Sequence, residues 1–181
     1  MSATPLYNEF PSFLKRYFPY KVQKISLNAG FTCPNRDGSK GYGGCTYCNN
    51  QTFNPDYCRT EKSIALQLEE GKRFFAHKYP EMKYLAYFQA YTNTYGELEP
   101  LKRKYEEALA VDGVVGLVIG TRPDCMPDDL LRYWKISTSI LSFWWNTVLR
   151  VLATRHSAAL TAGILFKLPS MRWSVRLLAE Y

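Results

Sequence analysis

The sequence predicts an α/β fold built on a parallel sheet. Three segments have the apolar content of strands, residues 21–27, 84–91 and 114–120, and each is followed by a segment with helical periodicity. Parallel neighbours need a crossover connection, which is usually a helix, so three strand–helix units in succession favour parallel strands. The length of 181 residues suits a single domain.

The first unit predicts a short helix, a strand and then a loop. Residues 7–20 are rich in Tyr, Phe and Lys, which favours a short helix that caps the sheet. Residues 21–27 (KVQKISL) alternate in polarity as a strand does, and they lead directly to a loop rich in Gly and Cys at 33–48. Loops that follow the carboxyl ends of strands carry function in βα folds. We therefore expect this loop to lie at the functional edge of the sheet.

The second unit consists of a helix and a strand that is apolar on both faces. The helix is predicted from Thr60 to about His77, with a core-facing stripe of Ile64, Leu68, Phe74 and Phe75. The strand at 84–91 (YLAYFQAY) is typical of a parallel strand buried on both sides, and a polar turn at 92–96 follows it.

The third unit ends in charged residues. A helix is predicted over 97–110, with one apolar face made by Leu98, Leu101, Tyr105, Ala108 and Leu109. The strand at 114–120 (VVGLVIG) runs into Arg122 and Asp124, which would either bind a ligand or pair with each other. Asp128 begins the third helix.

Three cysteines stand close together in the loop CPNRDGSKGYGGCTYC. Eleven residues separate Cys33 from Cys45, and two separate Cys45 from Cys48. Ordering a loop with so many glycines costs conformational entropy, which a bound group would offset. Three thiolates suit a [4Fe–4S] cluster with one iron left open, whereas structural zinc usually takes four ligands. With Cys58 as a fourth ligand, a zinc-stapled structural module stays an alternative.

A disulfide is less favoured than a metal centre. The N-terminal residues contain no uninterrupted apolar segment of the kind found in a signal peptide, and no stretch is long enough to span a bilayer. We therefore expect a cytoplasmic protein with reduced thiols and no membrane partner.

The motifs resemble those of radical S-adenosylmethionine (SAM) enzymes. Three cysteines that end in CxxC, with an aromatic residue before the last, look like the cluster loop of that superfamily. The short form of the motif has three residues between its first two cysteines, and the eleven found here are similar to the longer loop of the Elongator catalytic subunit. The segments YFQAYTNTYGELEPLK (87–102) and VVGLVIGTRPDC (114–125) resemble the YhcC-like radical SAM proteins. The resemblance runs from about Tyr7 to Tyr133.

This resemblance implies a site and a chemistry. The cluster would bind S-adenosylmethionine at its open iron, an electron donor such as flavodoxin or ferredoxin would reduce it, and a 5′-deoxyadenosyl radical would take hydrogen from an unknown substrate. The implied cluster ligands are Cys33, Cys45 and Cys48, Tyr47 would pack near the adenine, and Gln89, Thr92, Asn93 and Arg122 would line the SAM and substrate pocket. Thr92 and Asn93 replace a Gly-Gly-Glu element, so ordinary turn formation stays open as their role.

The resemblance also implies a partial (β/α)6 barrel, of which residues 1–133 would supply the first three units. Residues 134–181 differ in character, with all four tryptophans and a single acidic residue, Glu180. Codons can be chosen for this tail so that a shifted frame reads as family-like sequence, which suggests an aberrant, out-of-frame tail. We then expect the third strand to present an unpaired edge and the truncated chain to turn over little.

Net charge gives weak support for a nucleic-acid partner. The formal charge is +7, but six of the 23 basic residues and one of the 16 acidic residues lie in 134–181. Residues 1–133 thus carry 17 basic and 15 acidic side chains, and no RNA-binding motif accompanies them. A tRNA-interaction module, suggested by the Elongator-like spacing, is a third possibility.

Overall fold

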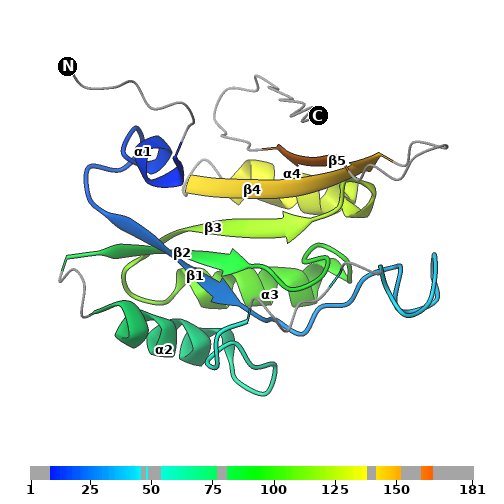
Figure 1. The fold of residues 1–181 in the computed structure, drawn as a ribbon, viewed down its shortest axis with the longest axis horizontal. Helices are drawn as coiled ribbons and strands as arrows, with labels where there is room; N and C mark the ends of the chain where they lie inside the picture. Colours follow the sequence, from blue (N-terminus) through cyan, green and yellow to red (C-terminus); the bar gives the residue numbers. More distant parts are fainter. Residues whose placement is uncertain are drawn as a thin grey trace.

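The computed structural model describes residues 9–45, 48, 54–76, 81–137, 142–151 and 160–164, the last two segments as backbone only. The described strands form one mixed sheet in the order β1-β2-β3-β4-β5 (Figure 1). The first three are β1 (Val22–Leu27), β2 (Lys83–Phe88) and β3 (Val114–Thr121), and they pair in parallel. The predicted parallel α/β arrangement is therefore confirmed for these strands.

Helices connect the strands as the sequence predicts. They are α1 (Phe10–Leu14), α2 (Ile64–Ala76), α3 (Leu98–Leu109) and α4 (Asp128–Ser137), with a short 3-10 helix η2 (Pro123–Cys125) after β3. The bounds of α3 match the prediction within one residue, whereas α1 occupies only five of the fourteen residues expected. No helix among the described segments is long and apolar enough to cross a bilayer.

The main core lies between the sheet and helices α2, α3 and α4. One face of the strands presents apolar side chains toward buried residues of these helices, as parallel strands covered by crossover helices do. The fully buried members include Ile25, Leu27, Phe88, Leu117 and Ile119 from the strands, and Leu68, Leu101, Tyr105, Leu130 and Trp134 from the helices. The predicted core face of α3 is confirmed, since Leu101, Tyr105 and Ala108 are buried.

The stripe predicted for α2 is correct in part. Ile64 and Leu68 are buried, and Phe75 packs against the core. Phe74, however, is 68% exposed, so its assignment to the core is wrong. Adjacent positions on a helix point about 100° apart, so Phe74 and Phe75 cannot both face the sheet.

The opposite face of the sheet carries a smaller core. Leu85 of β2 and Val118 of β3 pack with Leu14 and Phe18, which belong to α1 and the turn after it. The segment predicted to cap the sheet therefore covers it with only a few residues. Helix α1 lies over one part of this face, and the carboxyl ends of β1–β3 are at the opposite end of the strands from α1 (Figure 1).

Helix α2 approaches β1 so closely that only glycine fits at position 71. A Cβ added to Gly71 would lie 2.5 Å from Cγ2 of Ile25 and 3.2 Å from the ring of Tyr57. Ile25 is fully buried and cannot move aside without disturbing the core. The contact therefore requires a residue without a side chain.

We expect Gly71→Val to destabilise the fold by about 3 kcal/mol, the upper end for overpacked cores, because the clash outweighs the better helix propensity of a residue with a side chain. Urea unfolding followed by circular dichroism measures this cost. As a control, Arg73→Val changes an exposed position on the same helix and should cost about 0.5 kcal/mol. Equal losses for the two variants would contradict the close approach.

The predicted unpaired edge on β3 is wrong. Residues 116–121 of β3 pair in parallel with 142–147 of β4 (Ser142–Val151), and β4 pairs antiparallel with β5 (Leu160–Ile164). Aromatic and β-branched residues, which favour strands, are frequent in SFWWNTVLRV, so the segment can satisfy the backbone groups of β3. Moreover, α4 runs past residue 133, and Trp134 is 1% exposed. The fold therefore continues across the boundary at which the sequence changes character.

Candidate functional site

The cysteine loop closes on itself after β1. The backbone N–H of Arg36 donates to the carbonyl of Cys33 (2.8 Å), and that of Gly44 donates to the carbonyl of Asn35 (2.9 Å). Gly43 and Gly44 have φ angles of 75° and 84°, in the left-handed region that favours glycine. These contacts return the chain toward its start, so Cys45 comes back beside the residues that follow Cys33.

A cavity of about 180 Å³ joins this loop to the carboxyl ends of the strands. All three loop cysteines line it, together with residues at and just after the carboxyl ends of β2 and β3. The lining residues are Cys33, Asn35, Arg36, Gly44, Cys45, Cys48, Tyr87, Gln89, Tyr91, Thr92, Gly120, Thr121 and Arg122. The cysteines, which are far in sequence from the ends of β2 and β3, therefore share one concave surface with them, as expected of a βα fold.

The cavity contains six of the eight predicted site residues. These are the cysteines at 33, 45 and 48 together with Gln89, Thr92 and Arg122. Tyr47 lies outside the described residues. Asn93 is fully buried, and the cavity lining does not include it.

Asn93 holds the ends of two strands together. Its amide nitrogen donates to the carbonyls of Phe88 (3.0 Å) and Gly120 (2.8 Å), at the carboxyl ends of β2 and β3. Gly120 permits this approach, since an added Cβ would lie 3.2 Å from the Phe88 carbonyl oxygen. The geometry gives Asn93 a structural role of the kind that the sequence left open.

Gln89 and Thr92 are fixed by contacts with the neighbouring chain. The side-chain oxygen of Gln89 accepts from the Ser26 hydroxyl (2.9 Å) on β1. The backbone N–H of Thr92 donates to the carbonyl of Thr32 (3.2 Å), just before the first cysteine. The turn after β2 thus holds the start of the cysteine loop in position.

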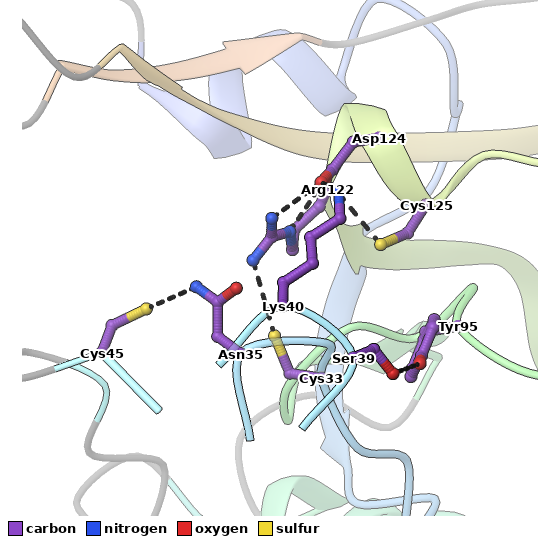
Figure 2. A network of polar contacts seen from close by, with 9 residues as sticks. All are labelled: Cys33, Asn35, Ser39, Lys40, Cys45, Tyr95, Arg122, Asp124 and Cys125. Atoms are coloured by element: carbon purple, nitrogen blue, oxygen red, sulfur yellow. Dashed lines mark hydrogen bonds and ion pairs between the residues drawn. The ribbon is translucent and has the colours of Figure 1, made fainter. Parts of the chain in front are cut away.

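Two of the cysteine sulfurs receive N–H donors. The Asn35 amide donates to Sγ of Cys45 (3.1 Å), and Nη1 of Arg122 approaches Sγ of Cys33 (3.7 Å) (Figure 2). Hydrogen bonds to thiolate sulfurs are a usual feature of the surroundings of metal centres, because they stabilise the ligand charge. Asn35 was not identified as a site residue from the sequence. Its position in the loop, two residues after Cys33, could have indicated that its amide lies near the cysteines.

Arg122 and Asp124 pair with each other. The guanidinium donates to both carboxylate oxygens of Asp124, from Nε at 2.9 Å and from Nη2 at 2.7 Å, and Lys40 adds an ion pair of 2.5 Å (Figure 2). The Arg122 guanidinium, followed by the Lys40 ammonium, holds the pKa of Asp124 well below its usual range. The same hydrogen bond with Asp124 raises the pKa of Arg122.

The remaining cysteines lie elsewhere. None of the five cysteines forms a disulfide. Cys58 is buried, and its thiol donates to the carbonyl of Ser26 (2.7 Å), outside the cavity. Cys125 is also buried, and burial raises the pKa of its thiol to about 11.

The thiols at the cavity do not form a tight single-ion site. Within the described part of the chain, no three His, Cys, Asp or Glu side chains converge tightly enough to hold one ion. One zinc needs every sulfur at about 2.3 Å from the same point. In an iron–sulfur cluster, each thiolate binds a different iron, so the sulfurs stand farther apart around a shared cavity. The three thiols line one cavity, and N–H donors approach the sulfurs of Cys33 and Cys45.

Burial should make Cys58 unreactive. Burial raises the pKa of its thiol from the ordinary 9.0 to about 12, so in the folded chain it alkylates at least ~100-fold more slowly at pH 8 than Cys33, which is half-buried at the cavity. Mass spectrometry after brief iodoacetamide treatment of the metal-free chain measures the two rates. In urea both cysteines should react alike.

The raised pKa of Cys58 also makes the stability of the fold depend on pH. The folded chain keeps the Cys58 proton to a higher pH than the unfolded chain does. The contribution of this thiol to the free energy of unfolding is therefore fully present below pH 9.0, and it is lost as the pH rises toward about 12. Cys58→Ala should therefore lose less stability than the parent between pH 9.0 and about 12.

The alkylation experiment also tests the position of Cys58. Equal alkylation of Cys58 and Cys33 in the folded chain would contradict the buried placement of Cys58.

Comparison with known proteins gives relatives by sequence. The chain is 44% identical over 138 residues to Protein YhcC of Escherichia coli, 42% identical over 127 residues to the uncharacterized protein YtqA of Bacillus subtilis, and 32% identical over 132 residues to the uncharacterized protein MJ0486 of Methanocaldococcus jannaschii. These matches cover 70–75% of the chain but only 38–43% of each relative. No family model and no solved structure matches the chain. The chain is thus similar to the YhcC and YtqA proteins and spans about two fifths of their length.

Proposed function

We propose that this chain belongs to the radical SAM superfamily and contributes the cluster-binding part of an iron–sulfur enzyme. Cys33, Cys45 and Cys48 would hold a [4Fe–4S] cluster, and the strand ends beside them would bind S-adenosylmethionine. When bound, these groups supply a one-electron cleavage of the sulfonium, which produces the radical that takes hydrogen from a substrate.

The observation on which the proposal depends is the shared cavity. Three thiols come from one loop, and Gln89, Thr92 and Arg122 come from the ends of two neighbouring strands. Loops and strand ends at the carboxyl edge of parallel strands are where βα folds place cofactors and substrates. A three-thiol loop at that edge is the arrangement that a cluster with one open iron requires.

The residues of the chain would bind, orient and shield. The loop cysteines provide the ligands, and the Asn35 amide stabilises charge on Cys45 through its hydrogen bond of 3.1 Å. Gln89, held by Ser26, and Thr92, held by the Thr32 carbonyl, present fixed polar groups to the cavity. Such preorganised groups can orient a polar cofactor without a further ordering cost.

The zinc-module alternative has less support. It needs Cys58 as a fourth ligand, and this thiol is buried against the Ser26 carbonyl away from the cavity. The fold would have to rearrange around β1 to bring it to the other cysteines.

Anaerobic reconstitution tests the proposal. The 181-residue chain, incubated with ferrous iron and sulfide, should turn brown, show a broad iron–sulfur absorption and, after reduction, give an electron paramagnetic resonance (EPR) signal that changes on addition of S-adenosylmethionine. A colourless chain that retains one zinc, lost in Cys58→Ala, would instead establish the structural module. A cluster whose spectrum ignores S-adenosylmethionine would contradict the radical SAM assignment.

A further inference from the structure

We propose that Lys40, Asp124 and Arg122 form a clamp that fixes the cysteine loop to the end of β3 and holds the guanidinium against the Cys33 sulfur. Arg122 is then a positioning residue that raises the reduction potential of the cluster. The inference rests on the proposed function for its redox part, and the clamp itself is a property of the chain.

The clamp joins segments that are remote in sequence. Lys40 lies in the cysteine loop, 84 positions before Asp124, and Cys33 lies 89 positions before Arg122. A further contact, between the hydroxyls of Ser39 and Tyr95 (2.7 Å), ties the same part of the loop to the turn after β2. The loop is therefore attached to both strand ends by side chains, in addition to its own backbone bonds (Figure 2).

The fork with Asp124 determines where Arg122 points. A bidentate pair uses Nε and Nη2 and fixes the guanidinium plane, so the direction of Nη1 is no longer free. Nη1 is the nitrogen that faces Cys33 at 3.7 Å. Lysine could supply the charge but not this geometry, because its ammonium has no planar fork.

Charge and exposure both favour an effect on a cluster. Asp124 stands between two cations, so the clamp carries a net positive charge, and its least exposed member is Arg122, at 22%, compared with 39% for Asp124 and 52% for Lys40. Reduction adds negative charge to a cluster, and a nearby N–H donor on a ligand sulfur stabilises the reduced form. The residue nearest the sulfur is also the one least screened by solvent.

The hydrogen bonds of Arg122 to Asp124 argue against Arg122 as the main ligand of the S-adenosylmethionine carboxylate. Two of its three nitrogens already bind Asp124. A second bidentate carboxylate would have to displace Asp124, which Lys40 also holds. The two roles make different predictions, because a carboxylate ligand affects cofactor affinity and the clamp affects potential.

Four variants separate positioning from simple charge. In Arg122→Gln the equilibrium constant for reduction of the cluster should decrease at least tenfold, which lowers the reduction potential by about 59 mV for one electron. Asp124→Asn is the sharpest test, because removing a negative charge would by itself raise the potential, whereas releasing Arg122 from Cys33 lowers it; we expect a lower potential. Lys40→Met should cause a smaller fall. Glu99→Gln, which breaks an exposed lysine pair of 2.7 Å with Lys102 on α3, should cause none.

The measurements are an EPR-monitored redox titration of the reconstituted chain and hydrogen exchange of loop peptides in the same chain before reconstitution. Asp124→Asn and Lys40→Met should speed exchange across residues 34–44, and Glu99→Gln should not. A raised potential in Asp124→Asn, or weaker S-adenosylmethionine binding with unchanged potential in Arg122→Gln, would overturn the positioning role. If the parent chain takes up no cluster, the proposed function fails, while hydrogen exchange still decides the clamp: unchanged loop exchange in both variants rejects it.

Discussion

Replacing Cys33, Cys45 or Cys48 by alanine should lower iron retention by at least about 100-fold. Loss of residues that merely orient a metal ligand costs about 10–100-fold in affinity, and loss of a ligand costs more. Each thiol lines the cavity at the end of the strands, so under the proposed function each substitution would remove one of the three bonds to the cluster. Iron and sulfide content after anaerobic reconstitution and desalting measures the effect.

The matched controls are Cys58→Ala and Cys125→Ala. Both thiols are buried, so both variants test whether any loss of thiol lowers iron uptake through general damage to the fold. They should retain the iron content of the parent. If Cys58→Ala loses as much iron as Cys33→Ala, then the three-thiol site is wrong and a four-ligand centre takes its place.

Trp134→Ala should destabilise the chain by about 3–5 kcal/mol, which is the range for truncating a large aromatic side chain in a core. Trp134 is 1% exposed, and its ring lies 5.8 Å from that of Tyr105, which in turn contacts the ring of Phe88 on β2. The loss is a large share of the roughly 5–15 kcal/mol that stabilises a typical domain. Urea unfolding, with the slope compared between variants, measures it.

Leu131→Ala is the control on the same helix. Leu131 is 37% exposed, so its truncation should cost about 0.5 kcal/mol or slightly more. This comparison also tests the boundary that the sequence suggested after Tyr133. If Trp134→Ala cost no more than Leu131→Ala, helix α4 would not pack as the structure describes, and an aberrant segment beginning at residue 134 would be the better description.

Much of the fold was predictable because its signals are local. The strand at 114–120 and the helix at 97–110 show apolar periods that depend on a few neighbouring residues, and both appear within one or two positions of their expected bounds. The cysteine spacing and its place directly after a strand likewise identified the three thiols that line the cavity. The strand at 142–151 was missed because its segment was interpreted as shifted coding sequence, although its residues favour a strand.

Roles within the site were less predictable, because adjacent residues can face different surroundings. Thr92 lines the cavity, while Asn93 turns inward to the carbonyls of Phe88 and Gly120. Phe74 and Phe75 show the same limit on a helix, one exposed and the other against the core. Polarity alone does not distinguish such neighbours, since the backbone twist at that point decides which side chain points where.

The sequence alone determined the order of the first three strands and their helices and the three-thiol loop after the first strand, since each depends on residues close together in the chain. Only the tertiary structure decided that Arg122 is held by Asp124 and Lys40 against Cys33, and that β3 is covered by β4. Those contacts depend on strand register and loop closure over tens of residues. Such relations leave no periodic pattern in the sequence, and they exist only once the sheet has assembled.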